Sequence, residues 1–293
     1  MIVFFGSGPV AADSLRLLEK HFEIEAIITK PTTVHEMKVT ISQPPIFGVS
    51  TKSELDELIL EKNFDSQVAI LIDFGIIVSK KVIQKFEFGI VNSHFSLLPE
   101  WRGADPITFS ILSGQEKTGV SLMLIDEGMD TGKLIAQKTL KLDLKVNNSE
   151  LTKQLINLSA EMLSMHIPKY LNNETKPRSQ PHPDRATYSR KLVKSDGILD
   201  FSKPATVLER EIRAYSSWPK SRTQIAGKDV VILDATASDI INPNGNTGSI
   251  TVTSEKKLSI KTAEGSLIIE TLKPAGKNVM GSGAFIAGYG SKL

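Results

Sequence analysis

A chain of 293 residues, 40% hydrophobic and 23% charged, has the composition of a folded protein longer than one average domain, which excludes intrinsic disorder. The lack of cysteine excludes disulfide frameworks and thiolate chemistry and is typical of a reducing compartment, so we expect a cytoplasmic protein. The net charge is only +2, and no apolar run approaches the roughly 18 residues of a membrane helix, so we expect no membrane partner.

The first half of the chain alternates short apolar runs with amphipathic stretches, a pattern typical of a mostly parallel sheet covered by helices. Residues 1–5 predict a buried strand, and Pro9 fits the first position of the helix that follows a glycine turn. A long helix is predicted over 147–170, where Asn147 and Glu150 are spaced as in a capping box. Further strands are predicted at 24–29, 67–72, 88–92 and 119–125.

A polar stretch rich in proline and without periodicity follows the long helix and indicates a surface linker. After it, residues 205–215 predict a short helix, and closely spaced apolar runs predict a small β-sandwich or a partly open barrel. These strands are expected at 228–235, 248–253, 257–262 and 265–272. We therefore expect a first domain at 1–172, a linker at 173–204 and a second domain at 205–293.

The basic residues are unevenly distributed. Residues 173–228 hold 12 Lys and Arg against 6 Asp and Glu, a local excess of 6 positive charges. One interpretation is a solvated linker that happens to be basic. The alternative is a surface that faces phosphate groups, for which Arg210 and Arg213 are candidates.

The stretch from Gly6 to Ala11 fits the glycine fingerprint of dinucleotide-binding proteins and lies between a predicted strand and a predicted helix. The fingerprint also requires an acidic residue at the end of the second strand, to hold a ribose hydroxyl. That strand ends in Thr29 and Lys30 instead. A nicotinamide cofactor is therefore not favoured, and the glycines are interpreted as a tight turn near another ligand.

Asn92 and His94 follow a predicted buried strand, at the end where open α/β sheets place their ligands. Residues two apart on an extended segment project to the same side, about 6.5 to 7 Å apart. An amide can donate to an oxygen that gains negative charge, and an imidazole can transfer a proton near neutral pH. The alternative for His94 is a structural histidine with all its hydrogen bonds made.

A Gly-rich loop after the predicted strand at 119–125 offers two carboxylates, Asp126 and Asp130. A carboxylate that reaches His94 would orient the imidazole and favour its charged form. The alternative for Asp130, which stands before Thr131 and Gly132, is that it caps a turn. The five histidines are too scattered for a compact metal motif, and we expect no metal site.

These residues together resemble the signature of the folate-dependent formyltransferases. The matching positions are Asn92, His94, Ser96, Leu97, Leu98, Pro99, Arg102, Gly103, Ala104, Pro106 and Asp130. The resemblance continues at 186–192, 212–219 and 272–280, so it covers nearly the whole chain. The run Lys-Pro-Ala-Gly-Lys within 272–280 is similar to the branch of the family that modifies methionyl-tRNA.

The resemblance implies a Rossmann-like domain that binds 10-formyltetrahydrofolate as a co-substrate and an OB-like β-barrel that binds initiator methionyl-tRNA. The formyl group would pass to the α-amino group of methionine through a tetrahedral intermediate. By resemblance, Asn92 donates to the oxyanion, His94 stabilises it and takes part in proton transfer, and Asp130 holds and charges the imidazole. We expect a monomer that needs no metal.

The folate site is implied to be lined by Ser96, Leu97, Leu98 and Pro99, with the stretch Phe74 to Ile77 as a wall for the pterin. Three positions depart from the family pattern. The loop at 30–46 is short and lacks arginine, so its ability to select initiator tRNA is in doubt, and Asp73 and Asp105 have no explanation from the sequence.

Other functions would share part of this pattern. A sugar-nucleotide N-formyltransferase would use the same donor and the same Asn, His and Asp side chains. An RNA-binding protein without activity would have no need of those side chains together.

Overall fold

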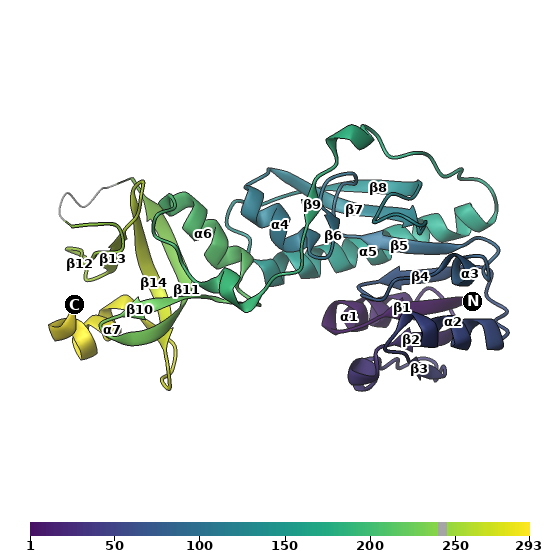
Figure 1. Ribbon diagram of the computed structural model, residues 1–293, viewed down its shortest axis with the longest axis horizontal. Helices are drawn as coiled ribbons and strands as arrows, with labels where there is room; N and C mark the ends of the chain where they lie inside the picture. The colour runs from purple at the N-terminus through teal and green to yellow at the C-terminus, as the bar shows by residue number, and fades with distance from the viewer. Residues whose placement is uncertain (240–244) are drawn as a thin grey trace. The chain divides into compact units, whose positions relative to one another are not determined.

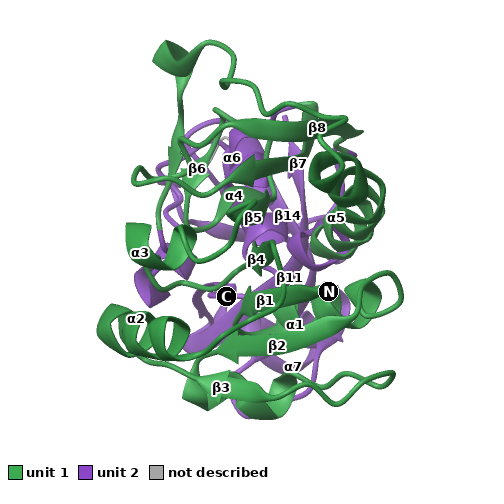
Figure 2. Cartoon of the chain, turned by 90° about the vertical axis from the view of Figure 1, so that its right-hand side faces the viewer, with its two compact units in different colours: residues 1–107, 116–142, 152–190 green, residues 108–115, 143–151, 191–293 purple. Residues whose placement is uncertain are grey.

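The computed structural model describes residues 1–239 and 245–293 and divides into two compact units (Figures 1 and 2). Unit 1 consists of Met1–Ile107, Glu116–Leu142 and Thr152–Arg190, drawn in green in Figure 2. Unit 2 consists of Thr108–Gln115, Asp143–Leu151 and Lys191–Leu293, drawn in purple.

Unit 1 is built on a seven-stranded sheet with the order β3-β2-β1-β4-β5-β7-β8. The strands β1 to β5 run parallel to their neighbours, whereas β7 pairs with β5 and with β8 in the antiparallel sense. The bounds are Ile2–Gly6 (β1), Ile24–Thr29 (β2), Ile46–Gly48 (β3), Ala69–Ile72 (β4), Ile90–His94 (β5), Lys117–Leu124 (β7) and Leu134–Lys141 (β8). The predicted mostly parallel α/β sheet is confirmed.

The inner strands of this sheet are buried on both faces, which explains why they appear in the sequence as continuous apolar runs. Alternate residues such as Val3 and Phe5 of β1 pack in one core with Leu55, Ile59 and Val82. The residues between them are also buried. The helices that supply this core are α2 (Lys52–Glu61) and α3 (Lys80–Ile83).

Helix α1 spans Pro9–Leu18 and α4 spans Pro106–Ser113. Helix α5 spans Asn148–Leu171, close to the predicted range. The predicted capping box is present, because the Glu150 backbone N–H donates to Asn147 Oδ1 at 3.0 Å and the Asn147 backbone N–H donates to Glu150 Oε2 at 3.3 Å. These two bonds satisfy backbone donors at the start of the helix.

Unit 2 contains an antiparallel half-barrel with the strand order β10-β11-β14-β13-β12, and β15 pairs with β14. Helix α6 (Ala205–Ala214) and helix α7 (Ser282–Tyr289) contribute to its core through apolar residues such as Leu208 and Phe285. The strands are Ser221–Ile225 (β10), Lys228–Ser238 (β11), Ile250–Val252 (β12), Leu258–Lys261 (β13), Ser266–Pro274 (β14) and Met280–Gly281 (β15). This agrees with the predicted small OB-like domain.

The stretch at 173–204 is divided between the units, because 173–190 belongs to unit 1 and 191–204 to unit 2. In unit 1, Arg178 forms a β-bridge with Leu134, and β9 (Tyr188–Ser189) pairs with β6 (Arg102–Gly103). Short 3-10 helices lie at Pro183–Arg185 and Lys194–Gly197, with another at the chain end, Gly290–Lys292.

The short loop at 30–46 is folded against unit 1. It begins with a 3-10 helix, Pro31–Glu36, and the Met37 side chain is fully buried. The Glu19 carboxylate accepts hydrogen bonds from the backbone N–H groups of Thr40 and Ile41 at 2.7 and 2.9 Å. Burial raises the pKa of Glu19, but these hydrogen bonds outweigh it and leave the pKa below its usual value.

Candidate active site

Strand β5 carries Asn92 and His94 to its carboxyl end, between β4 and β7. Asn92 lies opposite Leu71 of β4, and His94 lies opposite Ser121 of β7. Both side chains are buried, at 7% and 6% exposure. Ser93 points to the other side of the strand, where its hydroxyl bonds to Ser159 of α5 at 2.6 Å.

The Asp130 carboxylate lies between these two side chains. One oxygen, Oδ2, accepts from the Gly103 backbone N–H at 2.7 Å and is 3.8 Å from His94 Nδ1. The other, Oδ1, accepts from Asn92 Nδ2 at 3.4 Å. The structure therefore brings together the three side chains that sequence analysis selected, from β5 and from the loop between β7 and β8.

The imidazole of His94 is held from its other side by a backbone carbonyl. Nε2 is 2.9 Å from the Trp101 oxygen, and since a carbonyl can only accept, Nε2 carries the proton and donates. Nδ1 is left facing the Asp130 carboxylate. A proton arriving at Nδ1 would be stabilised there, so the arrangement can take up and release a proton at one defined atom.

The other carboxylate of this loop, Asp126, caps a turn. Its Oδ1 accepts from the Gly128 backbone N–H at 3.0 Å and from the Thr131 hydroxyl at 2.7 Å. Turn-capping was the alternative for Asp130, but in the structure Asp126 makes these turn bonds and Asp130 faces His94.

The turn from Ser96 to Pro99 is braced by Ser121 of β7. The Ser121 hydroxyl donates to the Ser96 carbonyl at 2.6 Å and accepts from the Leu98 backbone N–H at 3.0 Å. Ser96, Leu98 and Pro99 are buried, and Leu97 is half-buried. Leu97 is thus the residue of this turn that offers apolar surface to a ligand, and the other three shape the turn.

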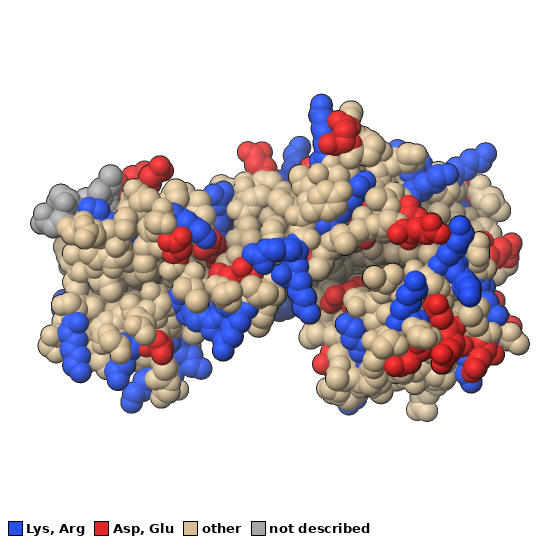
Figure 3. All heavy atoms as spheres, in the orientation of Figure 1, with Lys and Arg blue, Asp and Glu red and all other residues tan. Residues whose placement is uncertain are grey.

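The expected pterin wall is only partly open. The Phe74 side chain is 1% exposed and packs edge-on against Phe5 with ring centroids 5.5 Å apart, so it belongs to the core and cannot contact a ligand. Ile77 is 77% exposed. The prediction that the Phe74 side chain forms part of the pterin wall is therefore wrong, because its ring packs against Phe5 of β1 in the core. In Figure 3 the surface of unit 1 is hollowed between the parts that carry β6 and β4.

A second polar group, which the sequence left unexplained, lies at the end of β4. Asp73 follows this strand directly and therefore ends near the level of His94 on the neighbouring strand β5. Desolvation by the surrounding protein and the nearby Asp105 carboxylate raise the pKa of Asp73 to about 6, against the opposing effect of Lys30, although part of the side chain is open to water. The only sequence signal that could have pointed to Asp73 as part of the site was its place as an acidic residue at the carboxyl end of a buried strand.

We predict that Asp73→Asn stabilises the protein near neutral pH. The raised pKa means that the folded state binds the proton more tightly than the unfolded chain, so stability is fully present below the unfolded pKa and is lost as pH rises through about 6. Because water reaches the side chain, screening reduces the expected gain to about 1 kcal/mol. Urea unfolding should show this gain at about pH 7 and none at about pH 4. An equal gain at both pH values would contradict the assignment.

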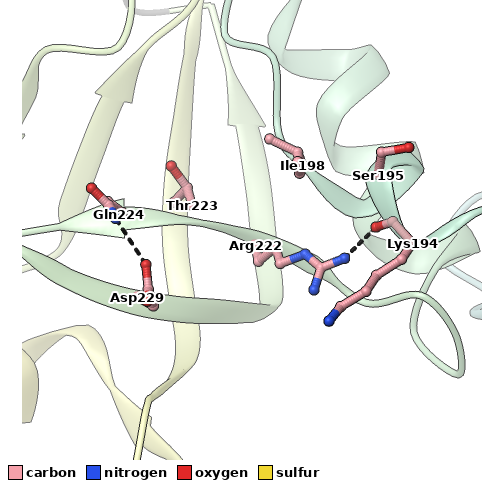
Figure 4. A pocket seen from close by; sticks show the side chains of 7 residues that line it. All are labelled: Lys194, Ser195, Ile198, Arg222, Thr223, Gln224 and Asp229. Atoms are coloured by element: carbon pink, nitrogen blue, oxygen red, sulfur yellow. Dashed lines mark hydrogen bonds between the residues drawn. The ribbon is translucent and has the colours of Figure 1, made fainter.

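Unit 2 contains a groove of about 780 Å³ beside β10. At one end Arg222 Nη2 donates to the Lys194 carbonyl, and the two cationic groups lie side by side (Figure 4). At the other end Gln224 Nε2 donates to Asp229 at 2.9 Å. Ile198, which is 60% exposed, also lines the groove. Several Lys and Arg side chains stand out on unit 2 in Figure 3.

The two arginines proposed for a phosphate-facing surface lie elsewhere on unit 2, on α6. Arg213 binds both oxygens of Glu209, at 2.6 and 3.0 Å, and donates to the Val146 carbonyl at 2.9 Å. Arg210 Nη1 is 3.5 Å from the Ser113 carbonyl. These guanidinium groups hold parts of unit 2 together, so Lys194 and Arg222 are better candidates for phosphate contacts.

Within the described ranges, 1–239 and 245–293, no group of three or more His, Cys, Asp or Glu side chains is arranged to hold a metal ion. The same ranges contain no helix that is both long enough and apolar enough to span a membrane.

Comparisons with known proteins identify the family of this chain. The family model for formyl transferase matches residues 3–167, and the model for the formyl transferase C-terminal domain matches residues 191–290. The chain therefore belongs to the formyl transferase family.

Its curated relatives include the methionyl-tRNA formyltransferases of Myxococcus xanthus and Halorhodospira halophila. The first is 32% identical over 98% of this chain and 95% of the relative, and the second is 33% identical over 94% and 92%. Within the family, the chain is thus similar over its full length to methionyl-tRNA formyltransferase.

Solved structures share the fold. HypX from Aquifex aeolicus, in complex with tetrahydrofolic acid, has a TM-score of 0.66 and 16% identity over 99% of this chain, which spans about half of HypX (47%). The N-formyltransferase from Helicobacter canadensis, in complex with folinic acid and dTDP-3-aminofucose, has a TM-score of 0.66 and 20% identity over 92% of this chain and 98% of that chain.

Proposed function

We propose that the protein transfers the formyl group of 10-formyltetrahydrofolate to the α-amino group of methionine on initiator methionyl-tRNA. The observation that carries this proposal is the convergence of Asn92, His94 and Asp130 in a chain whose full-length relatives are methionyl-tRNA formyltransferases. The folate supplies an activated formyl carbon, the methionine amine forms a bond to that carbon, and the folate nitrogen leaves with a proton.

The residues of unit 1 would divide this chemistry between them. The Asn92 amide donates to the oxygen that becomes negative when the amine adds, and His94 stabilises the same charge. His94 then moves a proton at Nδ1, where the Asp130 carboxylate holds and stabilises the charged ring. The half-buried Leu97 and the exposed Ile77 supply apolar surface that fits the flat pterin.

The second candidate is N-formylation of an amino sugar nucleotide. It is supported by the similarity to the Helicobacter canadensis N-formyltransferase, which binds dTDP-3-aminofucose together with folinic acid. That enzyme is 20% identical to this chain, whereas the methionyl-tRNA formyltransferase of Halorhodospira halophila is 33% identical. The greater identity favours the tRNA substrate.

An acceptor assay tests the two functions directly. The purified protein is incubated with 10-formyltetrahydrofolate and either charged initiator tRNA or a dTDP-amino sugar. We expect formylmethionine on the tRNA and no formylated sugar. Formylation of the sugar alone would support the second function instead. Uncharged tRNA as acceptor is the control.

We further propose that residues 1–172 carry catalysis and that residues 205–293, joined by 173–204, bind the tRNA. We also propose a monomer that acts in the cytoplasm, where translation takes place, and light scattering tests the oligomeric state. Lys194 and Arg222 lie side by side in the groove, and adjacent cations are suited to a phosphate of the RNA backbone.

We predict that Lys194→Glu weakens tRNA binding and makes it less dependent on salt. Each phosphate neutralised by a cation contributes about 0.7 to 0.9 to the slope of log affinity against log salt, so losing one contact should flatten the slope by about 1. Filter binding over a range of KCl concentrations measures this slope. Lys256→Glu is the matched control, because Lys256 is also exposed on unit 2 and does not line the groove. Equal salt slopes for the two variants would show that Lys194 does not contact the RNA.

A further inference from the structure

The stretch at 178–189 lies against the candidate active site, although the sequence indicates only a linker there. The backbone of Arg178 exchanges hydrogen bonds with Leu134, at 2.7 and 2.9 Å, just after the Asp130 loop. Thr187 accepts from the backbone N–H of Trp101 at 2.8 Å and from that of Arg102 at 2.9 Å. The segment is thus bonded to both loops that surround His94.

Gln180 is the side chain through which this segment reaches Asp130. It is 7% exposed, and its amide nitrogen donates to the backbone carbonyls of Asp130 at 2.7 Å and Gly132 at 3.0 Å. Its amide oxygen accepts from Arg102 Nη2 at 2.7 Å. Two donors at one end and an acceptor at the other are what only an amide side chain supplies in this position.

These bonds act on a backbone that needs support. Asp130 has φ 52, in the left-handed region that non-glycine residues adopt at a cost and keep only where their surroundings hold them. Arg102, which holds Gln180, is itself 6% exposed. Its neighbours make the remaining contacts of the site, since Trp101 accepts from His94 and Gly103 donates to the Asp130 carboxylate.

We propose that Gln180 is a positioning residue for formyl transfer, which fixes the Asp130 carboxylate against His94 by holding the backbone of the Asp130 loop. This inference rests on the proposed function and assigns Gln180 no contact with substrate. Partners that orient metal ligands typically affect activity by about 10-fold to 100-fold, and we expect an effect of the same order from a partner that orients a catalytic carboxylate.

The test compares Gln180→Met and Gln180→Glu with the native protein. Methionine keeps the volume and removes all three hydrogen bonds, so we expect kcat to fall by about 10-fold to 100-fold with KM for the folate changed by less than about threefold. Glutamate bonds to Arg102 but turns a carboxylate toward two carbonyls. Its activity relative to the native protein should rise as pH falls, because the protonated acid regains one donor.

Ser159→Ala is the control for general loss of stability, since it removes a buried hydrogen bond on the far side of β5. Hydrogen exchange at the Gly103 amide gives a second readout that needs no activity. Exchange should be faster in Gln180→Met than in Ser159→Ala, because the carboxylate that accepts this N–H has moved. Unchanged exchange, or native kcat in Gln180→Met, overturns the inference. The two proposals can fail separately. If the native protein formylates no methionyl-tRNA but exchange is faster in Gln180→Met, the positioning role stands and the proposed function is overturned.

Discussion

Replacing Asn92 with alanine is expected to lower kcat by two to three decades, about 3 to 4 kcal/mol of transition-state stabilisation. The amide of Asn92 is buried at the end of β5, and one of its two N–H groups points to Asp130 Oδ1. That bond orients the group so that the second N–H can donate to the oxyanion without reorganisation. Binding of the folate should change little, because the charge develops only during the reaction.

The neighbouring residue provides the control for this prediction. Ser93 is on the same strand and equally buried, but its hydroxyl bonds to Ser159 on the opposite side. Ser93→Ala should cost about 1 kcal/mol of stability and leave kcat unchanged. Single-turnover formylation of charged tRNA measures both variants. Native turnover in Asn92→Ala would show that this amide does not stabilise the oxyanion.

The strands of unit 1 could be predicted because a parallel sheet covered on both faces needs continuous apolar runs. The run at 119–125 looks like the others, yet β7 pairs with β5 in the antiparallel sense. Nothing local distinguishes the two directions, since strand order and direction depend on contacts between distant segments. The length of the connection between two strands is the only sequence signal for their relative direction, and between β5 and β7 it did not decide between parallel and antiparallel pairing.

Asn92 and His94 could be predicted as a pair because the period of a strand places them on one side. Asp130 was one of two candidates in its loop, and only the resemblance to a family preferred it to Asp126. Gln180 could not be predicted, because its partners Asp130 and Arg102 are 50 and 78 residues away and an irregular segment leaves no periodic pattern. Its polar, proline-rich surroundings are typical of a linker even though the side chain is buried.

The local excess of positive charge was informative only in part. A count of charges cannot separate Arg213, which is paired with Glu209 and a backbone carbonyl, from Lys194, which is exposed at a groove. Helical spacing did contain the clue for Arg213, because Glu209 stands four residues before it on α6. Charge reversal at Arg213 would therefore test folding more than RNA binding.

Replacing Asp130 with asparagine is expected to have the largest effect, a loss of about three to four decades in kcat. Asparagine can still accept from the Gly103 N–H, so the loop should keep its conformation. With its oxygen on the Gly103 N–H, the asparagine presents that same uncharged oxygen to His94 Nδ1, so a proton arriving at Nδ1 finds no negative charge to stabilise it. The charge that forms on the ring during amine attack would also lose its counter-ion.

Asp126→Asn is the matched control for this variant, because Asp126 belongs to the same loop and its exposed carboxylate caps a turn through Gly128 and Thr131. We expect Asp126→Asn to lower the melting temperature slightly and to keep native kcat. For Asp130→Asn, a melting temperature close to the native value together with the lost turnover would show that the charge is what matters. Should Asp130→Asn retain more than about a tenth of native turnover, proton transfer through His94 would not need this carboxylate, and the division of roles within the site would have to be redrawn.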